Sequence, residues 1–364
     1  YITLHGDFVI PDEIKGSEFE KPFIELIQTQ NNSYKALHQK LFPHFKEKYP
    51  EMTENKRGLN TLDGWAKEDA RYMLSLATEA QLGMTVNART LEYMIAASQS
   101  HPLSEIRDLG KQLYNLVKNI APSIVKYPEA TPFLEQMEDV YSNTDNCDEN
   151  KFSAEENLSV VRMLSEDISD QEILQALGFS LDQYDYNENR DFNKYRNRLS
   201  EIFKKMNMWD TPPRAFEWLD LKFELILSSS AFAQLKRHRM ATLLAQPYHC
   251  SLGATTPPSI KSINEEQVFA DTIGQTEELY WKVYDAFPVI APYVLTNAHR
   301  RRVLFKMNLR ELYHFVRLRA DVHAQWDIRK IAEEIEEMVK SRLPVTGLLL
   351  GGKDRFEEII RNLE

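Results

Sequence analysis

The residues with the greatest capacity for chemistry lie in the run RHRMATLLAQPYH, from Arg237 to His249. Two arginines bracket a histidine here, directly after SSSAFAQLK, a run that is typical of a short helix. Successive helical residues point about 100° apart, so we expect Arg237, His238 and Arg239 to contact separate parts of a long anionic ligand. Gln234 is predicted to share their side of the helix. The alternative is a solvated basic helix end, stabilised by the helix dipole.

A second candidate stretch runs from Asn308 to beyond His323. Asn308 and Arg319 are separated by close to three helical turns, so the two residues are expected to share one stripe about 16 Å long. The opposite stripe is apolar and predicts core. The alternatives are a surface pair between Arg319 and Asp321 and a purely structural role for His323.

Length and composition limit the class of protein. A chain of 364 residues is long enough for about two domains, and 43% hydrophobic with 27% charged residues is ordinary for a soluble globular protein. The net charge of -11 argues against broad nucleic-acid binding but permits a local cationic pocket. Cys147 and Cys250 are too few and too far apart for a disulfide framework or a thiolate metal site, which favours the cytoplasm and predicts no metal. No apolar run is long enough for a membrane span.

Alternation of apolar and polar residues predicts a half-buried β-strand at 219–227, followed by serines that are good helix N-caps. Helical spacing of apolar residues predicts helices at 19–45, 170–177, 264–288 and 308–341. The polar run at 51–64 predicts an exposed loop. Three further helices are predicted at 65–77, 86–98 and 103–120.

The chain also contains a weak internal repeat with two blocks. In the first block, Pro11 aligns with Pro257 and Phe23 with Phe269. In the second block, TVNARTLEYMI aligns with KMNLRELYHFV, which pairs Asn87 with Asn308, Arg89 with Arg310 and Leu91 with Leu312. We therefore predict a first repeat at 1–140, a polar linker at 141–157 and a second repeat at 158–364. The first repeat is expected to lack its front, because Tyr1 falls within a strand-like segment.

R-H-R followed by Met-Ala-Thr resembles the R-H-R-x-x-S motif of the flavin-dependent thymidylate synthases. That family also places the motif on a helix after an antiparallel strand, with a glutamine just upstream, as Gln234 is here. The run at 308–329 is similar to the family's second signature, N-x-R-x-L, then L-R, then A-Q-W-[ED]-I. The resemblance covers about 155–364 fully and 1–125 as a degenerate copy. It implies an α+β fold, with long helices packed on an antiparallel sheet that includes 219–227.

The resemblance also implies the ligands and their contacts. The family binds FAD and dUMP in a cleft shared among subunits of a homotetramer, with NADPH and methylenetetrahydrofolate as co-substrates. Here a dimer that forms a pseudo-tetramer, or a tetramer, is expected. Arg319 is the implied catalytic residue, stabilising negative charge on the pyrimidine, and Gln234 joins it in binding dUMP. The implied FAD contacts are Arg237, His238, Arg239, Asn308, Arg310 and His323.

Several positions depart from the family pattern N-E-x-S-x-R-Y after the serine. Thr242 stands for the serine, Leu244 and Ala245 for Asn and Glu, Pro247 for the substrate-loop serine and His249 for the phosphate-binding arginine. These departures fall mainly on nucleotide binding, so flavin binding is expected to survive better. The alternatives to a thymidylate synthase are a flavin- or nucleotide-binding homologue without that activity, acting on another pyrimidine or on none, and a helical scaffold.

Overall fold

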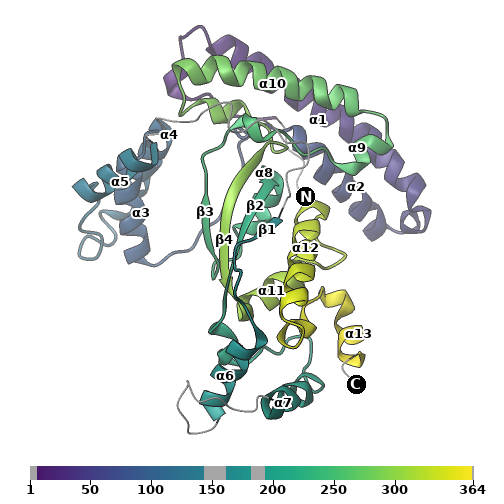
Figure 1. Cartoon of the computed structure of the whole chain (residues 1–364). Coiled ribbons are helices and arrows are strands. Elements are labelled where there is room, and N and C mark those ends of the chain that lie inside the picture. The colour runs from purple at the N-terminus through teal and green to yellow at the C-terminus, as the bar shows by residue number, and fades with distance from the viewer. Residues whose placement is uncertain (1–5, 143–160, 182–192, 363–364) are drawn as a thin grey trace. The chain divides into compact units, whose positions relative to one another are not determined.

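The computed structural model describes residues 6–142, 161–181 and 193–362 and divides into two compact units. The first unit comprises residues 1–153 with 256–299, and the second comprises 154–255 with 300–364 (Figure 1). The second half of the chain therefore contributes to both units. No described helix is long and apolar enough to span a membrane.

The second unit is built on a four-stranded antiparallel sheet in the order β1-β2-β4-β3. Its central strands β2 (Asp220–Ser228) and β4 (Arg300–Asn308) pair along their whole length, from Asp220 opposite Asn308 to Ser228 opposite Arg300. Strands β1 (Val161–Met163) and β3 (Thr242–Ala245) flank them. The α+β prediction is confirmed, and β2 lies one residue from the predicted strand.

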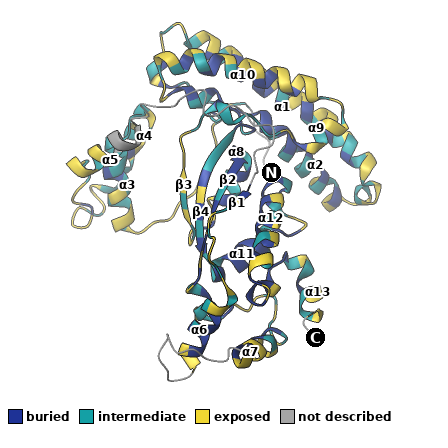
Figure 2. Ribbon diagram, viewed as in Figure 1, coloured by how far each residue is buried: buried dark blue, intermediate teal, exposed yellow. Residues whose placement is uncertain are grey.

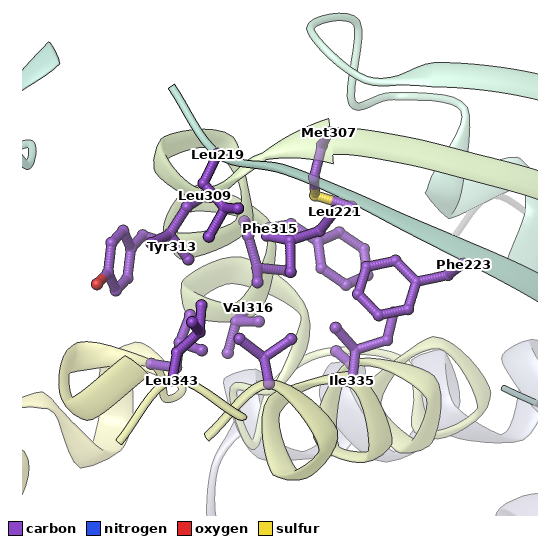
Figure 3. Close-up of a cluster of buried hydrophobic side chains, with 14 of the residues drawn as sticks. Leu219, Leu221, Phe223, Met307, Leu309, Tyr313, Phe315, Val316, Ile335 and Leu343 are labelled. Carbon is purple, nitrogen blue, oxygen red and sulfur yellow. The ribbon is translucent and has the colours of Figure 1, made fainter. Parts of the chain in front are cut away.

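One face of this sheet carries the core, because alternate side chains of a strand point to the same side. Leu221 and Phe223 of β2 and Met307 of β4 point towards α11 (Leu309–Arg319) and α12 (Trp326–Arg342), where Phe315 and Ile335 meet them (Figure 3). All five side chains are at most 2% exposed. The remaining helices of the unit are α6 (Asp170–Leu181), α7 (Asn193–Phe203), α8 (Ser229–Leu235) and α13 (Phe356–Arg361).

The helix predicted at 308–341 is interrupted, which corrects that prediction. Helix α11 ends at Arg319 and α12 begins at Trp326, where the Gln325 side chain accepts a hydrogen bond from Ile328 N at 3.1 Å. Between the two helices the Asp321 carboxylate accepts a hydrogen bond from His323 N. The short polar side chains of this stretch bind the backbone in place of helical partners, so the apolar periodicity continues while the helix does not.

The first unit is mostly helical. Its helices are α1 (Glu20–Lys48), α2 (Lys56–Ala70), α3 (Ala88–Ser100), α4 (Ser104–Val117), α5 (Pro132–Ser142), α9 (Pro258–Ser262) and α10 (Glu266–Ala286). The helices predicted at 86–98, 103–120 and 264–288 are confirmed. Two predictions are wrong: the supposed loop at 51–64 contains the start of α2, and 71–77 is a 3-10 turn with extended backbone. The predicted linker lies almost wholly outside the described residues.

The two repeats meet inside the first unit at equivalent positions. The first block, which aligns Phe23 with Phe269, also aligns Gln30 of α1 with Thr276 of α10. Gln30 Nε2 donates to Thr276 Oγ1 at 2.9 Å, and both side chains are fully buried. A residue that contacts its own counterpart lies on a local two-fold axis.

The second block of the repeat shows the same two-fold relation in its backbone. Leu76 N donates to the Leu295 carbonyl at 2.7 Å, and Asn297 N donates to the Leu74 carbonyl at 2.9 Å. When the register of the second block is extended towards lower residue numbers, Leu74 aligns with Leu295 and Leu76 with Asn297, so each bond is the counterpart of the other. These contacts make the internal repeat a structural feature of the first unit.

Candidate active site

The strongest candidate site lies in the second unit, where the two sequence motifs meet. Arg319 Nε donates to His238 Nε2 at 3.0 Å. The same guanidinium donates through Nη1 to Gln234 Oε1 at 3.1 Å and through Nη2 to the Gln234 carbonyl at 3.2 Å. Arg319, from one motif, thus contacts Gln234 and His238, from the other, at the C-terminal end of α8.

The position of His238 corrects one detail of the prediction. Helix α8 ends at Leu235, so Arg237, His238 and Arg239 lie in the turn that follows it and not on the helix. His238 is 5% exposed and packs its ring edge-to-face on Phe315 with centroids 5.0 Å apart. The neighbouring arginines are exposed. In this turn His238 is buried whereas Arg237 and Arg239 are exposed, so the three side chains do not form one face.

The geometry also defines the histidine tautomer. The Arg319 guanidinium always carries its protons, so His238 Nε2 must accept and the ring proton of a neutral imidazole sits on Nδ1. His238 Nδ1 lies 3.5 Å from Glu311 Oε1, and the Glu311 side chain is 13% exposed. Glu311 and Arg319, both on α11, are therefore connected through the imidazole of His238, which lies in the turn after α8.

Glu311 was not identified from the sequence, although a signal for it was present. Asn308 caps α11 by accepting a hydrogen bond from Glu311 N at 2.9 Å, and an N-cap followed three residues later by Glu is a helix-start pattern. The carboxylate is turned towards His238 and so belongs to the site. Asn308 connects to the cluster through this residue, as a cap.

Lys236, Arg237 and Arg239 form what we call the basic turn. All three residues are exposed, and the side chains of the two arginines form no hydrogen bond or ion pair with the residues that the structure describes. Their guanidinium groups stand beside a buried, already paired histidine. This arrangement suits an external anion, because planar guanidinium groups bind phosphate oxygens in pairs of hydrogen bonds.

The two other predicted cofactor contacts already have partners within the unit. Arg310 donates through Nη1 to Glu217 Oε1 at 2.6 Å and through Nε to the Pro212 carbonyl at 3.0 Å. Hydrogen bonds from Arg214 and Arg310 lower the pKa of Glu217. His323 is mostly exposed, and its Nδ1 lies 2.9 Å from Asp321 Oδ1. Arg310 anchors α11 to the 212–217 segment, and His323 lies in the turn between α11 and α12.

A hydrogen bond between a buried serine and a buried carboxylate supports the N-terminal end of α8. Ser228 Oγ donates to Asp327 Oδ2 at 2.5 Å and accepts from Ala231 N at 3.0 Å, which caps the helix. Arg300, opposite Ser228 in the sheet, provides a favourable charge for Asp327, while burial lowers the pKa of Arg300. The aspartate of the A-Q-W-D-I motif therefore fixes the helix that carries Gln234.

The segment that departs from the family pattern is part of the sheet. Thr242–Ala245 is β3, which pairs with β4 in register from Thr242 opposite Lys306 to Ala245 opposite Val303. His249 Nδ1 lies 2.7 Å from Ser251 Oγ and accepts a hydrogen bond from Ser251 N, which caps the 3-10 turn Cys250–Leu252. His249 thus has a local structural role.

The charged residues that α11 contributes to the cluster are not repeated in α3 of the first repeat. The second block of the repeat aligns Thr90 with Glu311 and Ser98 with Arg319. Asn87 caps α3 as Asn308 caps α11, accepting from Thr90 N at 2.8 Å, so the scaffold is preserved while the charged groups are replaced. Among the described residues, no group of three or more His, Cys, Asp or Glu is arranged to hold a metal ion.

Comparison with known proteins adds the family. The model of the family described as Thy1, thymidylate synthase complementing protein, matches residues 1–123 and 162–345. An UPF0159 protein of Thermoplasma acidophilum is 24% identical over 81% of this chain, which spans 62% of that protein's length. The flavin-dependent thymidylate synthase of Sulfurisphaera tokodaii is 36% identical over 32% of this chain and 49% of its own.

Among solved structures, a UMP/dUMP methylase, PolB, from Streptomyces cacaoi aligns with a TM-score of 0.42 and 18% identity, over 51% of this chain and 92% of its own. The family match, in contrast, extends over most of the chain. The chain belongs to the thymidylate synthase complementing protein family, Thy1.

Proposed function

We propose that this protein is a flavin-dependent thymidylate synthase, which converts dUMP to dTMP by reductive methylation at the pyrimidine. The observation that carries the proposal is the contact of Arg319 with both Gln234 and His238. This contact joins the two motifs on which the resemblance rests. Thymidylate synthases of the flavin-dependent kind are among the relatives, at 36% identity over about a third of the chain.

In this proposal Arg319 and Gln234 bind the pyrimidine. The Arg319 guanidinium is oriented by its bonds to Gln234 and His238, so it offers positive charge at a fixed position. Preorganised charge of this kind stabilises the negative charge that develops on a pyrimidine carbonyl when the ring is attacked. Glu311 holds the His238 tautomer that accepts from Arg319 Nε, so it acts as a positioning residue.

The basic turn fits the pyrophosphate of FAD. The side chains of Arg237 and Arg239 are exposed and have no partner among the described residues, whereas the Arg310 side chain donates to Glu217 and to the Pro212 carbonyl. We therefore assign FAD binding first to these two arginines and give Arg310 a structural role. Bound FAD, reduced by NADPH, would supply the hydride equivalent, and methylenetetrahydrofolate would supply the carbon. A second subunit is proposed to complete the cleft in a homo-oligomer.

Release of tritium from dUMP labelled at carbon 5 tests the proposal, because methylation replaces that hydrogen. The assay contains FAD, NADPH and methylenetetrahydrofolate. Arg319→Lys is expected to reduce the rate by about 100-fold or more, since a lysine keeps the charge but loses the planar donors. Arg329→Ala is the control, because Arg329 binds only the Val322 carbonyl in the described structure. Equal rates for the wild type and Arg319→Lys would exclude this role.

A second candidate function is a flavin-binding homologue that does not methylate dUMP. It is favoured by Leu244 and Ala245, which stand where the family pattern has Asn and Glu, and by His249, which caps a turn where the family resemblance implies a phosphate-binding arginine. A lost charge-assisted hydrogen bond reduces nucleotide affinity by about one to two powers of ten. If this candidate is correct, the protein retains FAD, releases no tritium, and His249→Arg increases dUMP affinity by about that factor.

A further inference from the structure

The segment 79–87 of the first unit occupies the same place in its repeat as β4 does in the second repeat. Both segments begin at an equivalent hydrogen bond: Glu79 N donates to the Asp7 carbonyl at 3.0 Å, and Arg300 N donates to the Gly253 carbonyl at 3.0 Å. Both also end at an asparagine that caps the next helix, α3 or α11. The backbone thus enters and leaves 79–87 as it enters and leaves β4.

The residues of 79–87 alternate as they do in a strand that packs on a core, but their apolar side chains are exposed. Leu82, Met84 and Val86 alternate with small or polar residues, as a half-buried strand requires. They are 89%, 53% and 36% exposed. Their counterparts in β4 are at most 2% exposed: Val303, Phe305 and Met307.

The backbone of this segment also lacks the inter-strand hydrogen bonds of a sheet within the described residues. Residues 80–86 form no backbone hydrogen bonds with other described residues, whereas β4 lies between β2 and β3. The stretch that leads into α3 is exposed along its length (Figure 2). An extended apolar segment with unpaired N–H and C=O groups is a template for another strand.

We propose that residues 79–87 pair with an antiparallel β-strand that serves the first repeat as β2 serves the second, and that this strand belongs to the residues preceding Tyr1 in the longer polypeptide. In the second repeat, β2 precedes α9 and α10, so its counterpart in the first repeat would precede residue 1. The chain spans 62% and 64% of the length of two UPF0159 relatives, which leaves more than a third of each for such a segment. Pairing with this strand would make 79–87 part of a sheet and would place Leu82, Met84 and Val86 together on one of its faces.

Amide hydrogen exchange compares the polypeptide that carries the preceding residues with the 1–364 chain. We expect the amides of residues 80–86 to exchange at nearly unprotected rates in the 1–364 chain and roughly tenfold or more slowly in the longer polypeptide. Unchanged exchange in the longer polypeptide would overturn the proposal. Protection that appears in the 1–364 chain itself, and grows with its concentration, would assign the occupant to a second copy and overturn it too.

Two neighbouring substitutions test the predicted faces. Met84→Lys places a charge where β4 has Phe305, and Thr85→Lys introduces the residue that β4 carries at the equivalent position, Lys306. In the longer polypeptide, Met84→Lys should abolish the protection of 80–86 while Thr85→Lys preserves it. In the 1–364 chain neither substitution should change exchange or the melting temperature, because both side chains are exposed. Equal effects of the two substitutions on the amide exchange of 80–86 in the longer polypeptide would contradict the proposed strand pairing.

Discussion

Arg319 holds the candidate site together and is also the residue that we propose to act in it. Its guanidinium donates to a ring nitrogen, a side-chain amide and a backbone carbonyl at the end of α8. A cation near a helix C-terminus is favoured by the partial negative charge of the last carbonyls. Because the same bonds orient the group, removing it affects both the geometry of the basic turn and any chemistry at the pyrimidine.

The basic turn gives the first prediction at this scale. Arg237→Ala and Arg239→Ala should each weaken FAD binding about 10- to 100-fold, which corresponds to the loss of a charge-assisted hydrogen bond. Both side chains are exposed, so the free energy of unfolding without FAD should change by less than about 0.5 kcal/mol. Flavin fluorescence titration and urea denaturation measure the two quantities.

Lys236→Ala is the matched control for this pair. Lys236 is an exposed cation in the same turn but is not an implied FAD contact. If its substitution weakens FAD binding as much as the arginine substitutions do, the turn binds FAD through net charge alone. The assignment of FAD binding to Arg237 and Arg239 in particular would then be wrong.

Ser228 gives the second prediction. Ser228→Ala removes the donor to the buried Asp327 carboxylate and the N-cap of α8, so we expect the second unit to lose about 2–4 kcal/mol of stability. Urea denaturation followed by circular dichroism measures this loss. Ser341→Ala, at an exposed serine of α12 that donates to the Met338 carbonyl, should cost much less. Similar losses for both variants would contradict the importance of the buried pair.

At the scale of elements, apolar periodicity predicted β2, α3, α4 and α10 because each has one buried face of regular period. It did not predict the start of α2, whose polar sequence in the run KRGLNTLDG resembles a loop. That helix forms because Leu62 and Ala66 are buried at the packing of α2 on α1 and because Asn55 caps it. Tertiary packing outweighs weak local propensity there.

The candidate site was predictable in part for a similar reason. Motif spacing identified Gln234, His238 and Arg319, but not that α8 stops at Leu235 or that Arg310 already pairs with Glu217. Both facts depend on contacts between segments far apart in the chain. A sequence pattern records which residues are present, whereas pairing between distant elements decides which of them are left to bind a ligand.

His299, in the turn before β4, gives a pH-dependent prediction. Burial lowers the pKa of His299 to about 4, and Thr296 N donates to its Nδ1 at 3.0 Å, a bond that only an unprotonated Nδ1 can accept. An unfolded histidine has a pKa of about 6.5. The folded ring is therefore neutral, and its contribution to stability is complete above pH 6.5 and is lost as the pH falls towards 4. The expected loss is roughly 3 kcal/mol.

Urea denaturation at pH 7 and pH 4.5 measures this effect as the difference between wild type and His299→Asn. The asparagine Oδ1 can replace Nδ1 as the acceptor but does not titrate. Glu277, 3.9 Å from His299 Nε2, has a pKa that burial raises, so its own contribution changes in the opposite direction in both proteins. Equal pH dependence in the two proteins would show that His299 is not the group involved.

At the scale of the whole molecule, the compact units do not follow the order of the chain. Residues 256–299 of the second half belong to the first unit, because α10 packs on α1 through the two-fold pairing at Gln30 and Thr276. The Gln234, His238 and Arg319 cluster, the basic turn and the Ser228–Asp327 pair all lie in the second unit. The residues that we propose to bind a ligand therefore belong to one unit.

The last prediction follows from that division. Calorimetry of the chain should show two unfolding transitions, one for each unit, since each has its own set of internal contacts. FAD at 100 times its dissociation constant should stabilise only the transition of the second unit, by about 2.7 kcal/mol, because a ligand that binds one folded unit shifts that equilibrium alone. Ser228→Ala should lower the same transition that FAD raises, and His299→Asn at pH 4.5 should raise the other. If FAD shifted both transitions equally, or if the two substitutions affected the same one, the units would unfold as a single cooperative body. The binding energy at Arg319 would then be coupled to the two-fold pairing of α1 with α10.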